Sequence, residues 1–151
     1  MSIKRNQVVE CARSYIGTPF AHAGRVKGRA LDCVGLPLMV AGDLGLKDTS
    51  GEPLHGRLYT AYTPQPVTTI VLDLCMKHLK RKGLQDLKPG DVLVMKVPST
   101  PCHVGIFTEM KDGLMYFVHA YTGADGTVEQ PVDARWKRRI VAAFEFPNVE
   151  D

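Results

Sequence analysis

Hydrophobic positions in the first half of the chain recur at helical spacing. Between Lys4 and Ile16 the apolar residues stand three to four positions apart, which predicts an amphipathic helix ending at Gly17-Thr18-Pro19. The same pattern predicts a mostly buried helix over Leu36–Leu46, closed by glycines, and a third helix over Thr68–Arg81. Glycine-, proline- and base-rich stretches lie between them and predict loops, over Phe20–Ala30 and Lys47–Pro66.

The pattern changes to that of strands after the turn signal Pro89-Gly90-Asp91. Apolar and β-branched runs follow one another, separated by short turns. The predicted strands are Val92–Val97, CHVGIFTEM, LMYFVHAYT and Arg139–Phe146. Helices come first and an antiparallel sheet follows, so the predicted class is α+β, with the N-terminal helices packed on a central antiparallel sheet.

Composition narrows the possible function classes. The 151 residues are 44% hydrophobic and 23% charged, as in an ordinary globular domain, and no apolar run approaches the ~20 residues of a membrane span. The N-terminal sequence has no apolar core of a signal peptide. A net charge of +3 is too small to imply nucleic-acid binding. The basic clusters Lys77–Lys82 and Trp136–Arg139 are predicted to be a solvated helix face and a strand end.

The segment Leu31–Leu38, LDCVGLPL, offers a candidate nucleophile. Asp32 is a plausible N-cap, which would place Cys33 in the first helical turn, where the helix N-terminus lowers a thiol pKa. Gly35 permits a close approach, whereas Pro37 lacks an N–H, so either the first turn is loose or the regular helix begins later. The alternative is that the cysteine is a small buried hydrophobe.

Two histidines on predicted neighbouring strands are candidate partners of the thiol. His103 and His119 share a face of the sheet if the hairpin between their strands closes through a three-residue loop, Lys111-Asp112-Gly113. A two-residue loop would put them on opposite faces. The functional interpretation therefore requires the three-residue loop or a longer odd one.

Zinc binding is a competing interpretation of the same residues. The four cysteines show no CxxC spacing, which predicts reduced thiols rather than a disulfide framework. Cys102 adjoins His103 in sequence, so on a strand their side chains should point to opposite faces. Because no paired-ligand spacing is present, zinc bound by Cys33, Cys102, His103 and His119 is disfavoured.

Five blocks of the sequence, in this order, resemble the NlpC-type cell-wall peptidases. They are ARSYIGTPFAHAGR, LDCVGL, LKPGDVLVM, HVGIF and FVHA, and they span about Ala12 to Ala120. These peptidases are papain-like cysteine peptidases that cut peptidoglycan stem peptides. The resemblance implies a papain-like NlpC-type fold in one domain over residues 1–151, with no separate wall-binding domain.

The resemblance also implies roles for single residues. Cys33 would be the nucleophile, His103 the general base and His119 the residue that orients the base. Phe20 stands where the family usually has a tyrosine that helps the oxyanion site, and nearby His22 is a candidate substitute. Val34 stands where members that hold a free amino end often have serine, and Asp32 is the acid that would hold that amine.

The implied reaction is hydrolysis of a stem-peptide amide bond, expected between γ-D-glutamyl and a diamino acid, without metal or organic cofactor. FAHAGR and DCVGL especially resemble short members from phage and prophage tail modules. We therefore expect a protein of the virion tail, made in the bacterial cytoplasm, with stem peptides and tail-tip or hub proteins as partners. Two alternatives are a non-enzymatic tail component, which Phe20 favours, and a thiol acyltransferase.

Overall fold

A six-stranded antiparallel sheet forms the centre of the computed structural model, which describes residues 2–54, 70–97 and 101–151 and, of residues 101 and 102, the backbone alone. The strand order is β4-β9-β5-β6-β7-β8, and all five pairings are antiparallel. The strands are β4 (Lys80–Lys82), β5 (Val92–Lys96), β6 (Pro101–Lys111), β7 (Leu114–Tyr121), β8 (Gly126–Pro131) and β9 (Ile140–Glu145).

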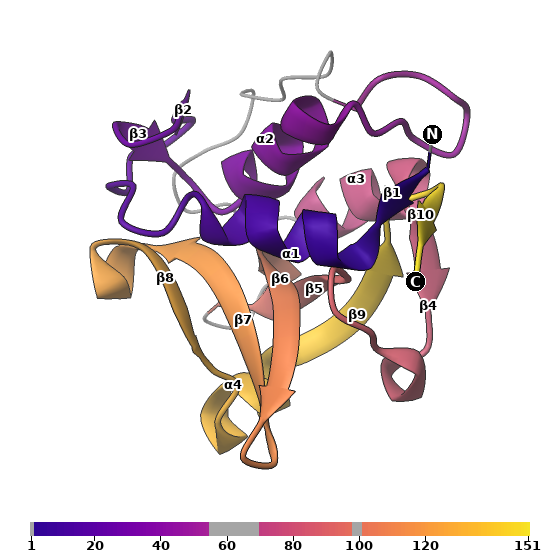
Figure 1. Ribbon diagram of the computed structural model, residues 1–151. Helices are drawn as coiled ribbons and strands as arrows, with labels where there is room; N and C mark the ends of the chain where they lie inside the picture. The colour runs from indigo at the N-terminus through magenta and orange to yellow at the C-terminus, as the bar shows by residue number, and fades with distance from the viewer. Residues whose placement is uncertain (1, 55–69, 98–100) are drawn as a thin grey trace.

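Three helices cover one face of this sheet and a short fourth helix lies on the other (Figure 1). The first three are α1 (Arg5–Arg13), α2 (Gly35–Leu44) and α3 (Ile70–His78), and the fourth is α4 (Ala134–Arg139). The predicted α+β class, with N-terminal helices on an antiparallel sheet, is confirmed. None of the helices within the described ranges is long and apolar enough to cross a membrane.

Smaller elements complete the chain. β1 (Ile3–Lys4) pairs in parallel with β10 (Val149–Glu150), and β2 (Arg25–Val26) forms a hairpin with β3 (Ala30–Leu31). Two single turns of 3-10 helix are η1 (Leu84–Asp86) and η2 (Thr122–Ala124).

The two faces of the sheet carry separate hydrophobic clusters. The helix-side cluster gathers α1, α2 and α3 on alternate sheet residues such as Val104, Ile106 and Val118. The opposite cluster, here called the Trp136 cluster, contains Leu93, Met95, Phe107, Phe117, Val132, Trp136 and Ala143. Because successive side chains of a strand point to opposite faces, neighbouring residues of β6 or β7 join opposite clusters.

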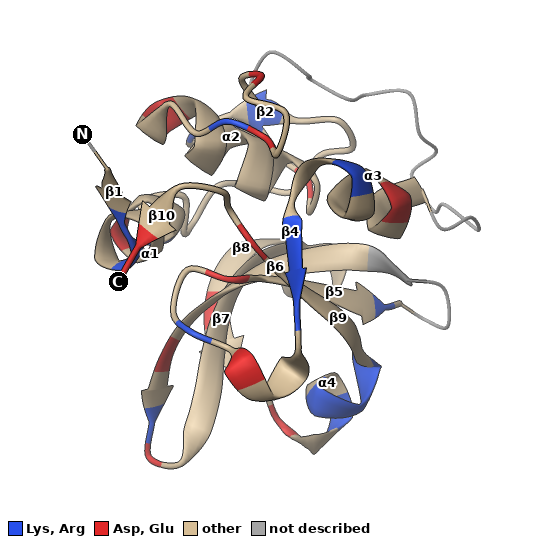
Figure 2. Cartoon of the chain, turned by 90° about the vertical axis from the view of Figure 1, so that its right-hand side faces the viewer, with Lys and Arg blue, Asp and Glu red and all other residues tan. Residues whose placement is uncertain are grey.

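Several sequence predictions need correction. Of the two glycines predicted to close the second helix, Gly42 lies inside α2, whereas Gly45 is confirmed as its C-terminal cap, with a left-handed φ of 67°. Lys80–Lys82 form β4 rather than the end of a helix, because they pair with the closing strand β9. The basic run at Trp136–Arg139 belongs to α4, not to a strand, and Figure 2 shows both basic segments in blue. The predicted loop beyond Leu54 lies outside the described residues.

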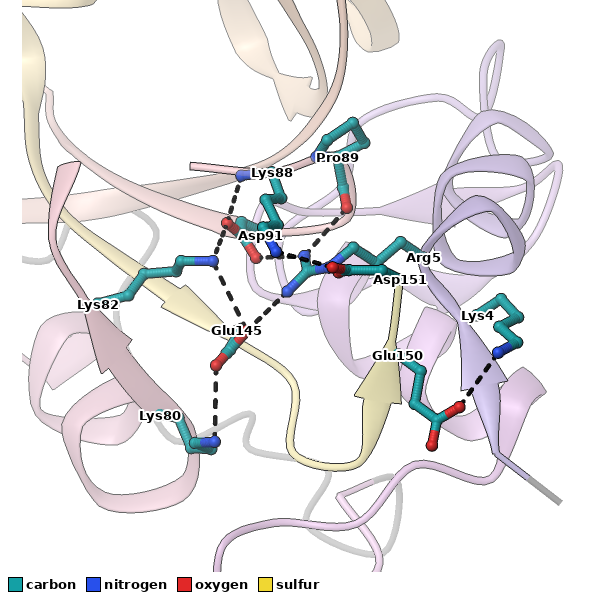
Figure 3. Close-up of polar contacts among 10 residues, drawn as sticks. All are labelled: Lys4, Arg5, Lys80, Lys82, Lys88, Pro89, Asp91, Glu145, Glu150 and Asp151. Carbon is teal, nitrogen blue, oxygen red and sulfur yellow. Dashed lines mark hydrogen bonds and ion pairs between the residues drawn. The ribbon is translucent and has the colours of Figure 1, made fainter. Parts of the chain in front are cut away.

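The chain ends are held by an ion-pair network around the buried Arg5 (Figure 3). Its guanidinium contacts Asp91 at 2.8 Å, Glu145 at 2.6 Å and Asp151 at 2.8 Å. Lys82 meets the other oxygen of Asp91 at 2.8 Å. Although burial alone would raise it, the lysines and Arg5 lower the pKa of Glu145. One cation at the start of α1 therefore ties both termini to the sheet.

Candidate active site

The carboxylate of Asp32 organises the loop before α2. It is buried, and its Oδ1 accepts hydrogen bonds from the Gly35 N–H and the Arg25 guanidinium, each at 2.8 Å. Its Oδ2 accepts from the Ala23 N–H at 2.8 Å. The carboxylate accepts the third N–H along the chain, as an N-cap does and as predicted, although Val34 holds the N-cap position of the regular helix α2. These three donors give Asp32 a structural task, and its binding of a substrate amine stays a prediction.

Cys33 is half-buried directly after this cap, two residues before the regular start of α2. The Leu36 N–H still reaches the Asp32 carbonyl at 3.3 Å, so the residues between them form a loose first turn. A Cβ on Gly35 would lie 2.6 Å from the Gly24 carbonyl oxygen, so only glycine lets the preceding loop pack this closely. The expected position of Cys33 near a helix N-terminus is confirmed, with the helix beginning later because of Pro37.

His103 and His119 lie on the same face of the sheet and contact each other. His103 Nε2 and His119 Nδ1 are 2.7 Å apart, and both side chains are buried. The predicted three-residue loop is nevertheless wrong. Lys111 pairs with Leu114, so the loop is the two residues Asp112 and Gly113.

A β-bulge restores the shared face that this two-residue loop would have destroyed. Phe107 pairs with Phe117 and Glu109 with Tyr116, which leaves Thr108 as one extra residue in β6. The extra residue reverses the facing of everything before it in β6. His103 thereby points to the same side as His119.

Aromatic side chains of the Trp136 cluster surround the two imidazoles. The His119 ring centroid lies 4.2 Å from Phe117, 5.0 Å from Trp136 and 5.4 Å from Tyr121. A Cβ on Gly105 would stand 2.7 Å from Phe117 Cδ2 and 3.3 Å from His119 Cβ. The glycine of the HVG motif thus leaves space for the side chains of Phe117 and His119, which pack over it from β7.

Burial keeps both imidazoles neutral near pH 7. It lowers the pKa of His119 to about 4, although a hydrogen bond to Gln130 acts in the opposite direction. Burial, then His119 and Arg139, lower the pKa of His103 well below 6.5. A neutral imidazole can accept a proton, which is what a general base requires.

Gln130 is a third member of this chain of contacts, and sequence reasoning missed it. Its Oε1 lies 2.8 Å from His119 Nε2. Gln130 stands on β8, a short and largely polar strand whose pattern predicts no regular structure. One feature of the sequence could have indicated it: Gln130 follows His119 by eleven residues, a separation at which two residues can lie on adjacent strands of a hairpin.

An apolar pocket separates the start of α2 from the start of β6. Val34, the residue after Cys33, and Val104, the residue after His103, both line it. Cys75 and His78 of α3 line it as well, but burial raises the pKa of the Cys75 thiol to about 12, so this cysteine is no nucleophile. Both neighbouring valines face this pocket on the helix side of the sheet, whereas His103 faces the Trp136 cluster, so the pairing of the Cys33 thiol with the His103 imidazole stays a prediction.

The remaining predicted site residues lie around the α2 start. Phe20 is half-buried against the helix-side cluster and forms an isolated β-bridge with Leu31. His22 is exposed on the loop that follows. Val34 is buried in the helix-side cluster. The substrate roles of these residues remain predictions. The side chain of Cys102 lies outside the described residues, so its facing is untested.

Comparison with known proteins now gives this arrangement a family. A profile described as the NlpC/P60 family matches residues 17–145, which is most of the chain. The chain belongs to the NlpC/P60 family. The resemblance of the five sequence blocks is thereby confirmed at the level of the family, which comprises peptidoglycan hydrolases and amidases. None of the curated proteins matches the chain.

Solved NlpC/P60 structures share the fold at low sequence identity. The NlpC/p60 domain of the peptidoglycan hydrolase SagA is 18% identical with a TM-score of 0.60, over 95% of this chain and 100% of that one. NlpC2 from Trichomonas vaginalis is 16% identical with a TM-score of 0.64, over 97% of this chain and 48% of that one. An N-acetylmuramoyl-L-alanine amidase from Bacteroides uniformis ATCC 8492 is 12% identical with a TM-score of 0.59, over 94% and 98%. The papain-like NlpC architecture is therefore established for this chain.

Proposed function

We propose that this NlpC/P60 domain is a cysteine endopeptidase that hydrolyses an amide bond in peptidoglycan stem peptides, between γ-D-glutamyl and a diamino acid. Cys33 is the nucleophile, His103 the general base and His119 the residue that orients it. The observation that carries the proposal is the 2.7 Å contact between His103 and His119, buried on one face of a family-typical sheet. Of these two neutral imidazoles, His103 can act as the base, and its contact with His119 holds its ring in place.

The proposed reaction is acyl transfer in two steps. His103 takes the proton of the Cys33 thiol, and the thiolate attacks the amide carbonyl while the N–H groups at the start of α2 stabilise the oxyanion. The resulting imidazolium then protonates the leaving amine. Water attacks the thioester with His103 again as base, which releases the acid and regenerates the thiol.

The surroundings of Cys33 support its choice over the other described cysteines. Burial, and then the nearby Asp43, raise the pKa of the Cys11 thiol to about 11, and burial raises that of Cys75 to about 12. Such thiols hold their protons at pH 7 and attack slowly. All three side chains are half-buried, but Cys33 lies at a helix N-terminus, where partial positive charge favours a thiolate.

Digestion of purified muropeptides tests the proposal. The wild type should release a product with a new diamino-acid amino end, identified by mass spectrometry, and Cys33→Ala and His103→Ala should abolish it. Cys11→Ala is the matched control and should cleave like the wild type. If Cys33→Ala keeps wild-type cleavage while Cys102→Ala loses it, the site is misassigned.

Phe20 favours one rival function, a non-enzymatic component with the same fold. Its phenyl ring offers no hydroxyl where the family usually has tyrosine, and losing one oxyanion donor costs on the order of 10²–10³ in rate. Intact muropeptides together with slow alkylation of Cys33 at pH 7 would establish this rival. The phage-tail setting is likewise a proposal, based on the FAHAGR and DCVGL blocks, and detection of the chain in purified virions tests it.

A further inference from the structure

Gln130 ends a chain of hydrogen bonds that crosses three adjacent strands. His103 comes from β6, His119 from β7 and Gln130 from β8. His103 Nε2 meets His119 Nδ1 at 2.7 Å, and His119 Nε2 meets the amide oxygen of Gln130 at 2.8 Å. Phe117, paired with Gln130 across the strands, and Trp136 cover the rings on this face. The three side chains form one row, in which the two imidazoles are buried and Gln130 is half-buried.

The structure turns the amide oxygen of Gln130, rather than its NH2 group, toward His119 Nε2. A carbonyl oxygen can only accept, so in this orientation of the amide His119 Nε2 carries a proton. A neutral imidazole then has its lone pair on Nδ1, which accepts from a proton on His103 Nε2. The lone pair of His103 is thereby left on Nδ1, the nitrogen outside the row.

We propose that Gln130 is a positioning residue that fixes the tautomers of both histidines, so that His103 presents an unprotonated Nδ1 to the Cys33 thiol. This inference rests on the proposed function. When the thiol proton arrives on Nδ1, the His103 cation still donates from Nε2 to His119. If the row ran in the opposite direction, His103 Nδ1 would already carry a proton and could not act as base.

Other polar groups around the rings do not fix these tautomers. Apart from the Cys33 thiol that the proposal places at His103, Tyr121 on β7 lies against the two rings and Arg139 at the end of α4 acts on His103 through its charge. Tyr121 contacts both rings through its face or edge, and the Arg139 guanidinium lies 4.7 Å from the Trp136 centroid. Gln130 is the acceptor in line with His119 Nε2.

Imidazole ¹⁵N NMR of the full chain tests the tautomers without substrate. At pH 7 the wild type should show a proton on Nε2 of both His103 and His119. Gln130→Met, which keeps the size but removes the acceptor, should lose this pattern and show mixed tautomers. Gln130→Glu keeps an acceptor and should keep the pattern, as should the control Gln85→Met at an exposed site. A wild-type proton on His119 Nδ1, or an unchanged pattern in Gln130→Met, overturns the inference.

Kinetics supply the second readout, with muropeptide as substrate. Gln130→Met should lower kcat about 10-fold or more with little change in KM, as partners that orient a reactive imidazole usually do. Gln130→Glu should retain turnover and move the acidic limb of the pH profile upward, because a carboxylate raises the pKa of the row and His103 must be neutral to act as base. A wild type with the expected tautomers but no cleavage refutes the proposed function alone. Cleavage equal in Gln130→Met and wild type refutes the role of Gln130 alone.

Discussion

Moderate acid should destabilise this fold through its histidine pair, before its carboxylates respond. The folded pKa of His119 is about 4, because the ring is buried, whereas an unfolded histidine titrates near 6.5. Between these values the unfolded chain binds the extra proton, so protonation favours unfolding. The stability contributed by a neutral His119 is complete above pH 6.5 and is lost as the pH falls toward 4.

The size of the effect follows from the two pKa values. For His119 alone, linkage gives a loss of about 2 kcal/mol in unfolding free energy at pH 5 and about 3 kcal/mol near pH 4. His103 adds a loss of the same sign, since its pKa is also lowered. Glu145 and Asp48 have pKa values below their ordinary range, so their contributions are lost only under stronger acid.

Urea unfolding between pH 7 and pH 5 measures this loss. The wild type should lose at least about 2 kcal/mol over this interval. His119→Gln should be less stable at pH 7 but show a flatter pH profile, because the group with the shifted pKa is gone. His22→Gln changes an exposed histidine and should keep the wild-type slope. Equal slopes in His119→Gln and the wild type would refute this reasoning.

Three further predictions concern packing and charge. Gly105→Ala should destabilise by about 1–3 kcal/mol in urea unfolding, because its Cβ would meet Phe117 at 2.7 Å. Asp91→Asn should cost about 3–5 kcal/mol, because it removes one of the two carboxylates that the buried Arg5 and Lys82 share and leaves only Glu145 in common. The matched variant Asp151→Asn, whose side chain is 70% exposed, should cost clearly less than Asp91→Asn. Gly35→Ala should lower the rate of muropeptide cleavage even under conditions where the variant remains folded. Its Cβ would meet the Gly24 carbonyl oxygen and displace the loop that packs on the start of α2, where Cys33 lies.

Periodic apolar patterns predicted most helices and strands, because those elements bury one face. α1, α2 and β9 fall within three residues of the ranges that the spacing indicates. β4 was predicted wrongly, because Lys80–Lys82 carry no strand signal and become extended only by pairing with β9. β8 was not predicted for the same reason: it is short and polar and lies at the sheet edge.

In the candidate site too, the features that depend on neighbouring residues could be predicted, and those that depend on strand pairing could not. The Asp32 cap and the place of Cys33 follow from neighbouring residues, so the sequence predicts them. Asp112 and Gly113, with φ of 54° and 77°, form a two-residue hairpin turn that their Asp-Gly sequence favours. The bulge at Thr108 has no local sequence signal, and without it the correct turn gives the wrong facing for His103.

The bulge that positions His103 is held from the opposite face of the sheet. Thr108 donates its hydroxyl to Glu129 at 2.6 Å, and Glu129 in turn accepts from Arg13 of α1 at 3.0 Å. Glu129 pairs across the strands with Val118 of the helix-side cluster, so these contacts lie away from the imidazoles. Each side of the sheet thus contributes to one site: α1 fixes the register of β6 through the bulge, and that register delivers His103 to His119 on the far face. The polar contacts of Thr108 therefore support, from the helix side, the same facing of His103 that the aromatic residues support around the rings.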